Sequence, residues 1–284
     1  MHLAALYRYP VKSLNGHRLD RAVAEDRGLR DDRRWMFVDP DGTFISQRTQ
    51  RALAGYRATV TAEGGLAFTR VADGADVAYL SAPRPSGAPD TPVDVWGTRF
   101  DACRVRDPGL PDLTAELGIP GARLVYMSDD VRRPVDPRYA RRASEEVSFA
   151  DGYPYLVVTA ESLAALEAKY VADGASGGAG LDVRRFRPNL VVAGAPEAFA
   201  EDEWADLVVS GQRFYNAKPC ARCGVITHDP DTGAVDRGVQ RALASMRRAP
   251  GGKVLFGVNC CLVGEGGELR VGDAVEVQRR ASRP

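Results

Sequence analysis

Two cysteines stand at C-x-x-C spacing in the segment KPCARCGVITHDPDTG, which covers residues 218–233. A structural zinc site takes four ligands, commonly two such pairs or one pair with two histidines. Cys260 and Cys261 make a poor second pair, because adjacent side chains in a strand point to opposite faces. The histidines are scattered over the chain, at His2, His17 and His228. The spacing therefore gives little support to zinc.

The same pair gives little support to redox chemistry of its own. A thioredoxin-like pair stands near a strand–helix junction, whereas residues 224–227, GVIT, predict a strand directly after Cys223. The C-x4-C-x2-C spacing of a plant-type iron–sulfur site does not occur in the sequence. Two buried thiols without chemistry remain an alternative, since free cysteine is among the most buried residue types.

Basic neighbours favour a further role for Cys223. Arg222 precedes it directly, and Lys218 lies five residues before it. Cations lower the pKa of a nearby thiol and favour the thiolate. A thiolate in a basic pocket would suit a soft metal on an anionic organic cofactor. The residues alone leave this role and the inert thiols open.

The composition is that of an ordinary globular protein. The chain has 284 residues, 44% of them hydrophobic and 27% charged, which allows one large or two modest domains. Lys and Arg number 38, as do Asp and Glu, so the net charge is zero and offers no overall attraction for nucleic acid or an anionic membrane. The sequence begins with no signal-peptide pattern and contains no apolar run of about 20 residues. We expect a cytoplasmic protein with reduced thiols.

Short strands dominate the first hundred residues. The segment Asp39–Gly42, D-P-D-G, predicts a hairpin turn, and residues 81–92 predict a long loop because they are rich in Pro, Gly and Ser. Trp35 lies between strands and predicts core. Runs rich in β-branched and aromatic residues predict strands at 3–9, 19–24, 34–38, 43–46, 58–61, 66–71 and 93–95.

Helices enter in the second half. Apolar spacing predicts helices over 112–118, with Asp112 as N-cap, over 159–172, and over 239–246, with Met246 in the core. Strands are predicted at 155–158, 190–193, 207–210, 213–216, 224–227, 254–262 and 274–278. Strands outnumber helices and do not alternate with them. This pattern predicts a strand-rich α+β protein, with a β-barrel covered by helices, rather than a doubly wound sheet.

Several segments, taken together and in order, carry a family resemblance. They are YPVKSLNG (9–16), GLRDDRRWMFVDPDG (28–42), FADGYPYLVVTAESL (149–163), RFRPNLVV (185–192), AEDEWADLVVSG (200–211), CARC followed by THDPDTG (220–233) and RVGDAVEV (270–277). With them the chain resembles the MOSC family, named after the C-terminal domain of molybdenum cofactor sulfurase, and in particular its amidoxime-reducing branch. The resemblance implies an N-terminal MOSC-associated β-rich, barrel-like domain over 1–108 and a MOSC β-barrel domain that binds molybdenum cofactor over 109–284.

The resemblance also implies roles for individual residues. Cys223, the second cysteine of C-x-R-C, would ligate molybdenum, while Cys220 would not. Asp151 would lie beside the metal and relay protons, provided that its pKa is raised. The contacts to the pterin and its phosphate would come from Lys12, Ser13, Arg33, Arg187, Asn189, Ala221 and Arg222.

The activity implied by the resemblance is reduction of N-hydroxylated compounds, such as amidoximes, hydroxylamines and N-hydroxylated bases, by a molybdenum cofactor. We expect neither an iron–sulfur cluster nor pyridoxal phosphate in this chain, so electrons would come from a separate ferredoxin- or flavin-type protein. An alternative is a carrier of molybdenum cofactor, or of sulfur as a persulfide on Cys223. Gly152 and Tyr153 stand where relatives close to the mammalian enzymes carry Thr-Ser, which leaves the substrate open.

Two smaller features have structural interpretations. His17 and His228 predict surface or turn positions. Residues 229–233, D-P-D-T-G, predict a tight turn.

Overall fold

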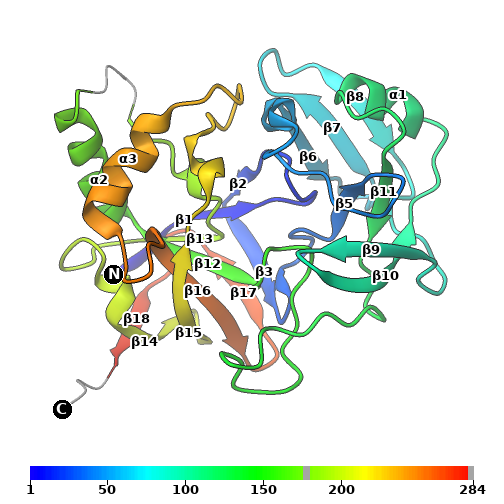
Figure 1. Ribbon diagram of the computed structural model, residues 1–284. Coiled ribbons are helices and arrows are strands. Elements are labelled where there is room, and N and C mark those ends of the chain that lie inside the picture. Colours follow the sequence, from blue (N-terminus) through cyan, green and yellow to red (C-terminus); the bar gives the residue numbers. More distant parts are fainter. Residues whose placement is uncertain (175–179, 281–284) are drawn as a thin grey trace.

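The computed structural model describes residues 1–174 and 180–280, which form two strand-rich halves lying side by side (Figure 1). One half holds the largest sheet and the helices α2 (Ala160–Ala172) and α3 (Arg237–Arg247). The other half holds smaller sheets and the short helix α1 (Leu110–Glu116). No helix within the described ranges is both long and apolar enough to cross a membrane.

The largest sheet joins the two ends of the chain. Its strands lie in the order β18-β14-β15-β16-β12-β13-β1-β2. Strands β12 and β13 pair in parallel with α2 as the crossover between them, and the other pairs are antiparallel. The bounds are β1 His2–Arg8, β2 His17–Leu19, β12 Tyr155–Thr159, β13 Leu190–Ala193, β14 Trp204–Val209, β15 Gln212–Ala221, β16 Leu255–Val263 and β18 Val275–Arg279.

A small sheet also links the ends of the chain, with β17 (Gly267–Arg270) beside β3 (Arg21–Glu25) and β4 (Gly28–Leu29). The N-terminal strands therefore complete the C-terminal half. They deliver the segment after β1, which contains the YPVKS motif, to the boundary between the halves.

The other half has two sheets, in the orders β5-β11-β10-β9 and β6-β7-β8. Trp35, Phe37 and Phe68 are buried in its core, and the Trp35 Nε1–H donates to the Pro83 carbonyl at 2.7 Å. The bounds are β5 Trp35–Val38, β6 Tyr56–Val60, β7 Leu66–Arg70, β8 Asp76–Leu80, β9 Thr91–Val95, β10 Thr98–Arg104 and β11 Arg123–Tyr126, with a 3-10 helix η1 at Arg51–Gly55.

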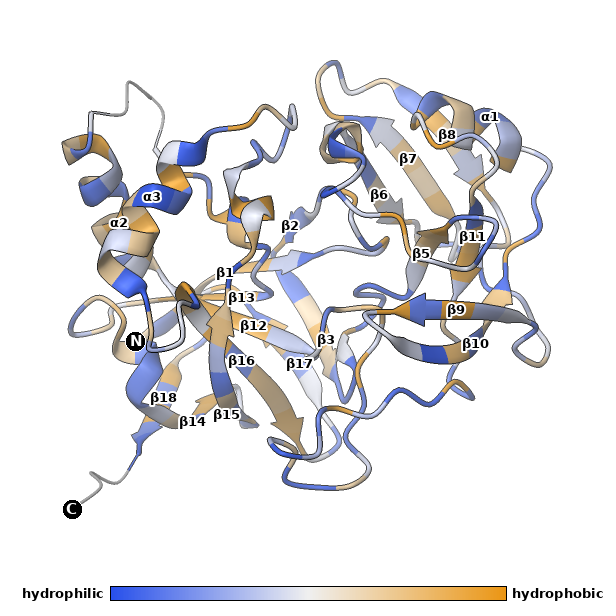
Figure 2. Ribbon diagram, in the orientation of Figure 1, coloured by the Kyte–Doolittle hydropathy of each residue, from blue (hydrophilic) through white to orange (hydrophobic). Residues whose placement is uncertain are grey.

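The longer helices bury one face each against the largest sheet. Thr159 caps α2, because its hydroxyl accepts the Ser162 N–H. Val239 and Leu243 of α3 join a cluster with Phe186 and Phe256, while the opposite face of α3 is polar. Figure 2 shows hydrophilic and hydrophobic residues on different sides of this helix.

These observations confirm a strand-rich α+β protein. The boundary predicted between residues 108 and 109 stays a prediction, and strand pairing crosses it. Strand β11 pairs with β5 and β10 of the first half, and β1 pairs with β13 of the second. On β16, Cys260 and Cys261 are both buried, in different apolar clusters, as their adjacency predicts.

Two predicted strands are wrong. Residues 43–46 make only single bridges, because the Asp39 carboxylate accepts the N–H groups of Asp41 and Thr43 and holds a tight turn there. Residues 224–227 form the 3-10 helix η4 (Gly224–Thr227), in which the Thr227 hydroxyl donates to the Gly224 carbonyl. The reason given above against a redox pair therefore fails, although Cys220 lies within β15 and begins no helix.

Smaller corrections concern helix ends and missed strands. Helix α1 begins at Leu110 with Gly109 as its cap, so Asp112 lies in the first turn and is not the N-cap. Met246 is 37% exposed rather than buried. Strands β4, β8, β10, β11 and β17 were not predicted, because their charged and small residues hide the alternation.

Candidate cofactor-binding site

A cavity lies at the boundary between the two halves, and we call it the central cavity. It brings together all but one of the site residues predicted from the sequence, namely Lys12, Ser13, Arg33, Asp151, Arg187, Asn189, Arg222 and Cys223. Ala221 is not among the lining residues. It is exposed at the end of β15, where its backbone pairs with Leu255.

The two cysteines of C-x-x-C have different surroundings. Cys223 follows the end of β15 and directly precedes η4, which leaves it half-buried at the wall of the cavity. Cys220 also lines the cavity, but its sulfur accepts a hydrogen bond from Arg222 Nη1 at 3.0 Å. No hydrogen bond to the Cys223 sulfur occurs within the described part of the chain. Of the two thiols, Cys223 is the one left available to a ligand.

The described residues do not provide a structural zinc site around this pair. Within residues 1–174 and 180–280, no group of three or more His, Cys, Asp or Glu side chains is placed to hold a metal ion. All five cysteines are free thiols. A metal at Cys223 would therefore depend on donors from another molecule, such as the dithiolene of a pterin.

Lys12 and Asp151 form an ion pair across the cavity. The Lys12 Nζ donates to Asp151 Oδ1 at 2.5 Å and to the Phe149 carbonyl at 2.8 Å. Lys12 is only 7% exposed, whereas the Asp151 side chain is 66% exposed at the cavity mouth. Burial lowers the pKa of Lys12, and the Asp151 charge opposes that effect.

The pKa of Asp151 runs against the role of acid. Loss of water around the carboxyl raises its pKa, but the Lys12 charge and hydrogen bonds from Lys12 and Trp96 outweigh that effect. The net result is a pKa below the ordinary value, so Asp151 is a carboxylate at neutral pH. The raised pKa that the proton-relay role required is not found in this arrangement, and the role itself stays a prediction.

Arg33 and Arg187 both lie over the Tyr9 ring. Their guanidinium carbons are 4.5 Å and 4.4 Å from its centre. Arg33 donates to the buried Asp32 carboxylate, to Asn189 Oδ1 at 3.2 Å and to the Arg187 carbonyl at 3.0 Å. Burial lowers the pKa of Arg187 to about 10, and the Arg33 charge adds to this.

Asn189 holds Arg33 in position through its side-chain amide. Its amide oxygen also accepts the Leu156 N–H at 3.3 Å, and its amide nitrogen donates to the Tyr7 carbonyl at 3.3 Å. Because the amide is already engaged at both ends, Asn189 supports Arg33 in addition to lining the cavity.

Several residues with strained backbone conformations line the cavity. Positive φ angles occur at Ser13 (71°), Arg33 (51°), Trp96 (56°) and Arg187 (56°), all of which line it. Non-glycine residues adopt this region rarely and mostly where the surroundings enforce it. Each of these residues turns the chain sharply, which brings its side chain or its neighbour's to the cavity wall.

Sequence reasoning missed Trp96 and Phe44. Trp96 lies at the turn between β9 and β10, and its Nε1–H donates to Asp151 Oδ1 at 3.1 Å. Phe44 packs edge-on against Trp96 at 4.7 Å, and Lys12 Nζ lies 5.0 Å from its ring. A tryptophan before a glycine, directly after the predicted strand 93–95, was the available signal for Trp96.

Arg133 was also missed. This buried side chain donates to the carbonyls of Ser148, Ala150 and Asp151 at 2.5–3.1 Å, and burial lowers its pKa to about 10. It fixes the loop that carries Asp151. One arginine among many in an irregular segment gives no sequence signal for such a role.

Tyr153 occupies the position that departs from the relatives' pattern. Its ring is 8% exposed and lines the cavity, and burial raises the pKa of the phenol. Its hydroxyl is buried without a hydrogen-bond partner among the described residues.

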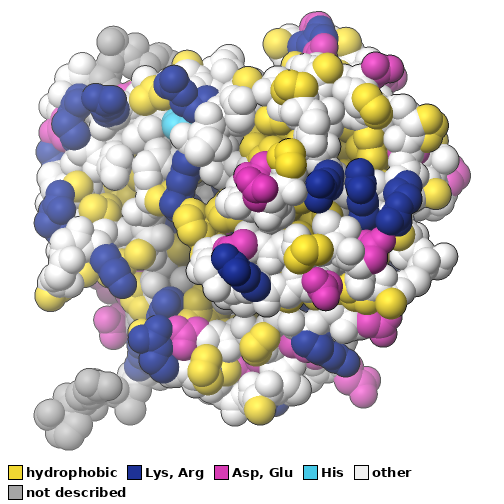
Figure 3. Space-filling view, turned by 45° about the vertical axis from the view of Figure 1, so that its right-hand side comes forward, with side chains coloured by type: hydrophobic (Ala, Val, Ile, Leu, Met, Phe, Trp, Pro, Cys, Tyr) yellow, Lys and Arg dark blue, Asp and Glu magenta, His cyan; other side chains and the backbone are white. Residues whose placement is uncertain are grey.

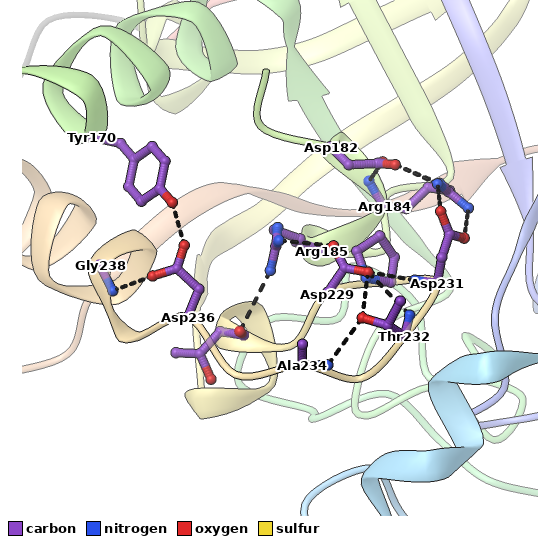
Figure 4. A network of polar contacts seen from close by, with 12 residues as sticks. Tyr170, Asp182, Arg184, Arg185, Asp229, Asp231, Thr232, Ala234, Asp236 and Gly238 are labelled. Atoms are coloured by element: carbon purple, nitrogen blue, oxygen red, sulfur yellow. Dashed lines mark hydrogen bonds and ion pairs between the residues drawn. The ribbon is translucent and has the colours of Figure 1, made fainter. Parts of the chain in front are cut away.

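The D-P-D-T-G turn is confirmed, and it ties the site segments together (Figure 4). Asp231 accepts from Arg184 at 2.6 Å and 2.8 Å and from Asn15 Nδ2 at 3.0 Å. Asp229 accepts from Arg185 at 3.1 Å. The turn thus links the YPVKSLN and RFRPN segments. His228, just before it, is 9% exposed, so the predicted surface position is wrong.

Comparison with known proteins agrees with this geometry. The family description "MOSC N-terminal beta barrel domain" matches residues 1–113, and "MOSC domain" matches residues 144–276. Mitochondrial amidoxime-reducing component 1 of Homo sapiens is 26% identical over 96% of this chain and 82% of its own length. Mitochondrial amidoxime reducing component 2 of Bos taurus is 28% identical over 83% and 68%.

A second kind of relative is much longer. Molybdenum cofactor sulfurase of Oryza sativa subsp. japonica is 28% identical over 91% of this chain, which spans only 32% of that protein. The two domain matches together cover well over half of the sequence. This chain belongs to the MOSC family.

Proposed function

We propose that this protein reduces N-hydroxylated compounds with a molybdenum cofactor held by Cys223, using electrons from a separate protein. The observation that carries the proposal is an available thiol in the wall of a cavity lined by five cations, Lys12, Arg33, Arg48, Arg187 and Arg222. The amidoxime-reducing names of two relatives support the reaction type. The five free cysteines fit a reducing, cytoplasmic setting.

The chain's own residues fit an anionic pterin with a phosphate tail. Lys12 has three N–H donors, of which Phe149 and Asp151 take two. Arg187 donates to the Leu14 carbonyl through one nitrogen, which leaves its other N–H groups for a ligand. Arg222 donates to the Cys220 sulfur and the Phe186 carbonyl through Nη1 and Nη2, and each of these nitrogens keeps one further N–H. These unsatisfied donors suit phosphate oxygens and pterin acceptors.

When bound, the cofactor would supply the two-electron reduction that cleaves the N–O bond. An amidoxime consumes two electrons and two protons and gives an amidine and water. In this proposal the Lys12 ammonium, whose pKa is lowered by burial, is a proton source in the cavity wall. The Asp151 carboxylate orients that ammonium and accepts a hydrogen bond from an N–H of the substrate.

Cys223→Ser tests the proposal, with Cys220→Ser as its matched control. Protein from a molybdenum-replete host is assayed for molybdenum by elemental analysis, for pterin by fluorescence, and for benzamidoxime reduction by reduced methyl viologen. We expect Cys223→Ser to lose molybdenum and turnover, and Cys220→Ser to keep both. Equal losses in the two variants would contradict a single cysteine ligand.

The same assay separates the alternative of a carrier. A carrier of molybdenum cofactor or of sulfur would show exchangeable cofactor, or sulfane sulfur on Cys223, without turnover. Similarity to a molybdenum cofactor sulfurase is the observation that keeps this alternative in the experiment.

A further inference from the structure

A second, more open hollow adjoins the central cavity at Cys223. Arg48, Arg222, Cys223 and Val225 line both. We call the second hollow the basic groove, because it is lined by six exposed cations, Arg48, Arg51, Arg237, Arg241, Arg248 and Lys253. No aspartate or glutamate occurs among the described residues that line it.

The charges of the groove are not neutralised by the protein. Elsewhere arginines pair with carboxylates, as Arg247 does with Asp202 one residue before Arg248. None of the six exposed cations makes such a pair within the part of the chain that the structure describes. Since the chain as a whole has a net charge of zero, the groove is a local excess of positive charge. Figure 3 shows Lys and Arg side chains on the face that carries the helices.

Helix α3 contributes two of the groove cations. Arg237 and Arg241 line the groove one turn apart, together with Gln240 and Ala244 between and after them. The apolar side of the same helix is buried in the core. Arg48 and Arg51 approach from the other half of the molecule. The groove is therefore a charged surface held by rigid elements on both sides.

Burial distinguishes the groove from the central cavity. Lys12 and Arg33 of the cavity are 7% and 9% exposed and are fixed by hydrogen bonds, which suits a tightly held anion. The groove cations are exposed, and exposed charges contribute to encounter rate and orientation more than to affinity. This favours a large partner that meets the surface transiently over a small anion that is bound tightly.

The position of the groove gives it a use in the proposed reaction. Asp151 and Trp96 mark the mouth of the central cavity, where a substrate would enter. The groove adjoins this mouth, since Arg48 lines both hollows and its guanidinium lies 4.2 Å from the centre of the Trp96 ring. An electron donor in the groove would therefore lie close to Cys223 and beside the substrate entrance.

We propose that the basic groove is the docking surface for an acidic electron-transfer protein. This inference rests on the proposed function, which requires electrons from outside the chain. Redox partners form small, weak interfaces that depend on complementary charge and weaken as salt screens it. Reduction of one benzamidoxime by a one-electron ferredoxin oxidises two reduced ferredoxins, takes up two protons and releases benzamidine and water.

The test uses the full chain loaded with cofactor and the double variant Arg237→Glu/Arg241→Glu. Benzamidoxime reduction is driven either by reduced methyl viologen or by an acidic [2Fe–2S] ferredoxin with its reductase. We expect the ferredoxin KM to rise about tenfold or more at low ionic strength, and its salt dependence to flatten. The kcat with viologen should stay at the wild-type value.

Arg21→Glu/Arg279→Glu is the matched control, since both residues are exposed, lie outside the groove and give the same change in net charge. It should leave the ferredoxin KM unchanged. A wild-type ferredoxin KM in the Arg237→Glu/Arg241→Glu variant would overturn the inference. Wild-type protein that turns over with viologen but not with ferredoxin would overturn it too, while leaving the proposed function intact. Wild-type, metal-loaded protein that fails with viologen would overturn the proposed function itself.

A small anionic substrate is the rival occupant. The 5′-monophosphate of N4-hydroxycytidine and the nucleoside are compared with viologen as the reductant. If the Arg237→Glu/Arg241→Glu variant raises the KM of the monophosphate alone, with the ferredoxin KM unchanged, the groove is a phosphate subsite and the docking inference is wrong.

Discussion

Asp32 offers a sharp test of how the cavity is built. Its side chain is fully buried and pairs with Arg33. Its Oδ1 also accepts the Tyr9 N–H at 2.8 Å. Asp32→Ala removes both interactions and leaves a buried guanidinium and a buried backbone donor without this partner.

The expected loss follows from what Arg33 retains. Removing one partner of a buried ion pair costs about 3–5 kcal/mol. Two acceptors remain for Arg33, at 3.2 Å and 3.0 Å, which places this cost at the lower end. The orphaned Tyr9 N–H adds about 1 kcal/mol, so we expect Asp32→Ala to lower the free energy of unfolding by about 4 kcal/mol. Asp32→Asn keeps an acceptor for Tyr9 and should lose about 2 kcal/mol.

Urea unfolding of the cofactor-free protein measures these values. The wild type, both Asp32 variants, Arg33→Met and the double variant Asp32→Ala/Arg33→Met form a cycle that isolates the pair. The double variant should lose less than the sum of the single losses, because the stranded charge is gone. A loss below about 1 kcal/mol for Asp32→Ala, within the range of ordinary surface changes, would refute the reasoning.

Two further predictions concern titration. Burial raises the pKa of Glu201 above its ordinary value of 4.5. The folded state therefore binds this proton more tightly than the unfolded state does. The free energy of unfolding then falls as the pH rises from the unfolded pKa through the folded pKa. Glu201→Gln should remove this decrease from the urea unfolding midpoint, measured as a function of pH between pH 4 and pH 8. An unchanged pH dependence of the midpoint would contradict the prediction for Glu201. Trp96→Phe deletes the hydrogen bond to Asp151 and should raise the pKa of Asp151, measured by carboxyl carbon NMR. An unchanged titration would show that Lys12 alone sets it.

Much of the fold could be predicted because its elements are locally specified. Helix α2 has a capping threonine and a regular apolar stripe, and the prediction of 159–172 matches Ala160–Ala172 with Thr159 as cap. The buried strands β12, β13 and β16 are continuous apolar runs. Such patterns depend only on neighbouring residues, which a single sequence contains.

The misses have tertiary causes. GVIT favours a strand by composition, yet residues 224–227 form a 3-10 helix. There the Arg222 N–H is taken by the Val254 carbonyl at 2.8 Å, and the D-P-D-T-G turn follows closely. The surface position predicted for His228 is wrong because burial brings it near Arg51 and Arg185, which are distant in the sequence. The pairing of β1 with β13 joins residues far apart in the chain, and no local pattern specifies it.

The site residues could be predicted from motifs, whereas the residues that hold them in position could not. Lys12, Arg187 and Cys223 lie in recognisable segments, and the structure brings them to one cavity. Arg133 and Trp96 act on Asp151 from outside those segments. Trp96 and Arg133 lie 55 and 18 residues from Asp151 in the sequence, and no local pattern predicts these contacts.

The hydrogen-bond acceptors of the cavity cations explain why the site suits an anion. Arg187 and Arg222 donate to the carbonyls of Leu14 and Phe186, whereas Lys12 and Arg33 also pair with the carboxylates of Asp151 and Asp32. A carbonyl satisfies a buried N–H without neutralising its charge, whereas a carboxylate does both. Arg187 and Arg222 therefore keep positive charge in the cavity that no carboxylate of the described residues cancels, at the desolvation cost that lowers the pKa of Arg187. An anionic ligand would relieve this cost on binding, so its affinity should be larger than that of a neutral molecule of the same shape.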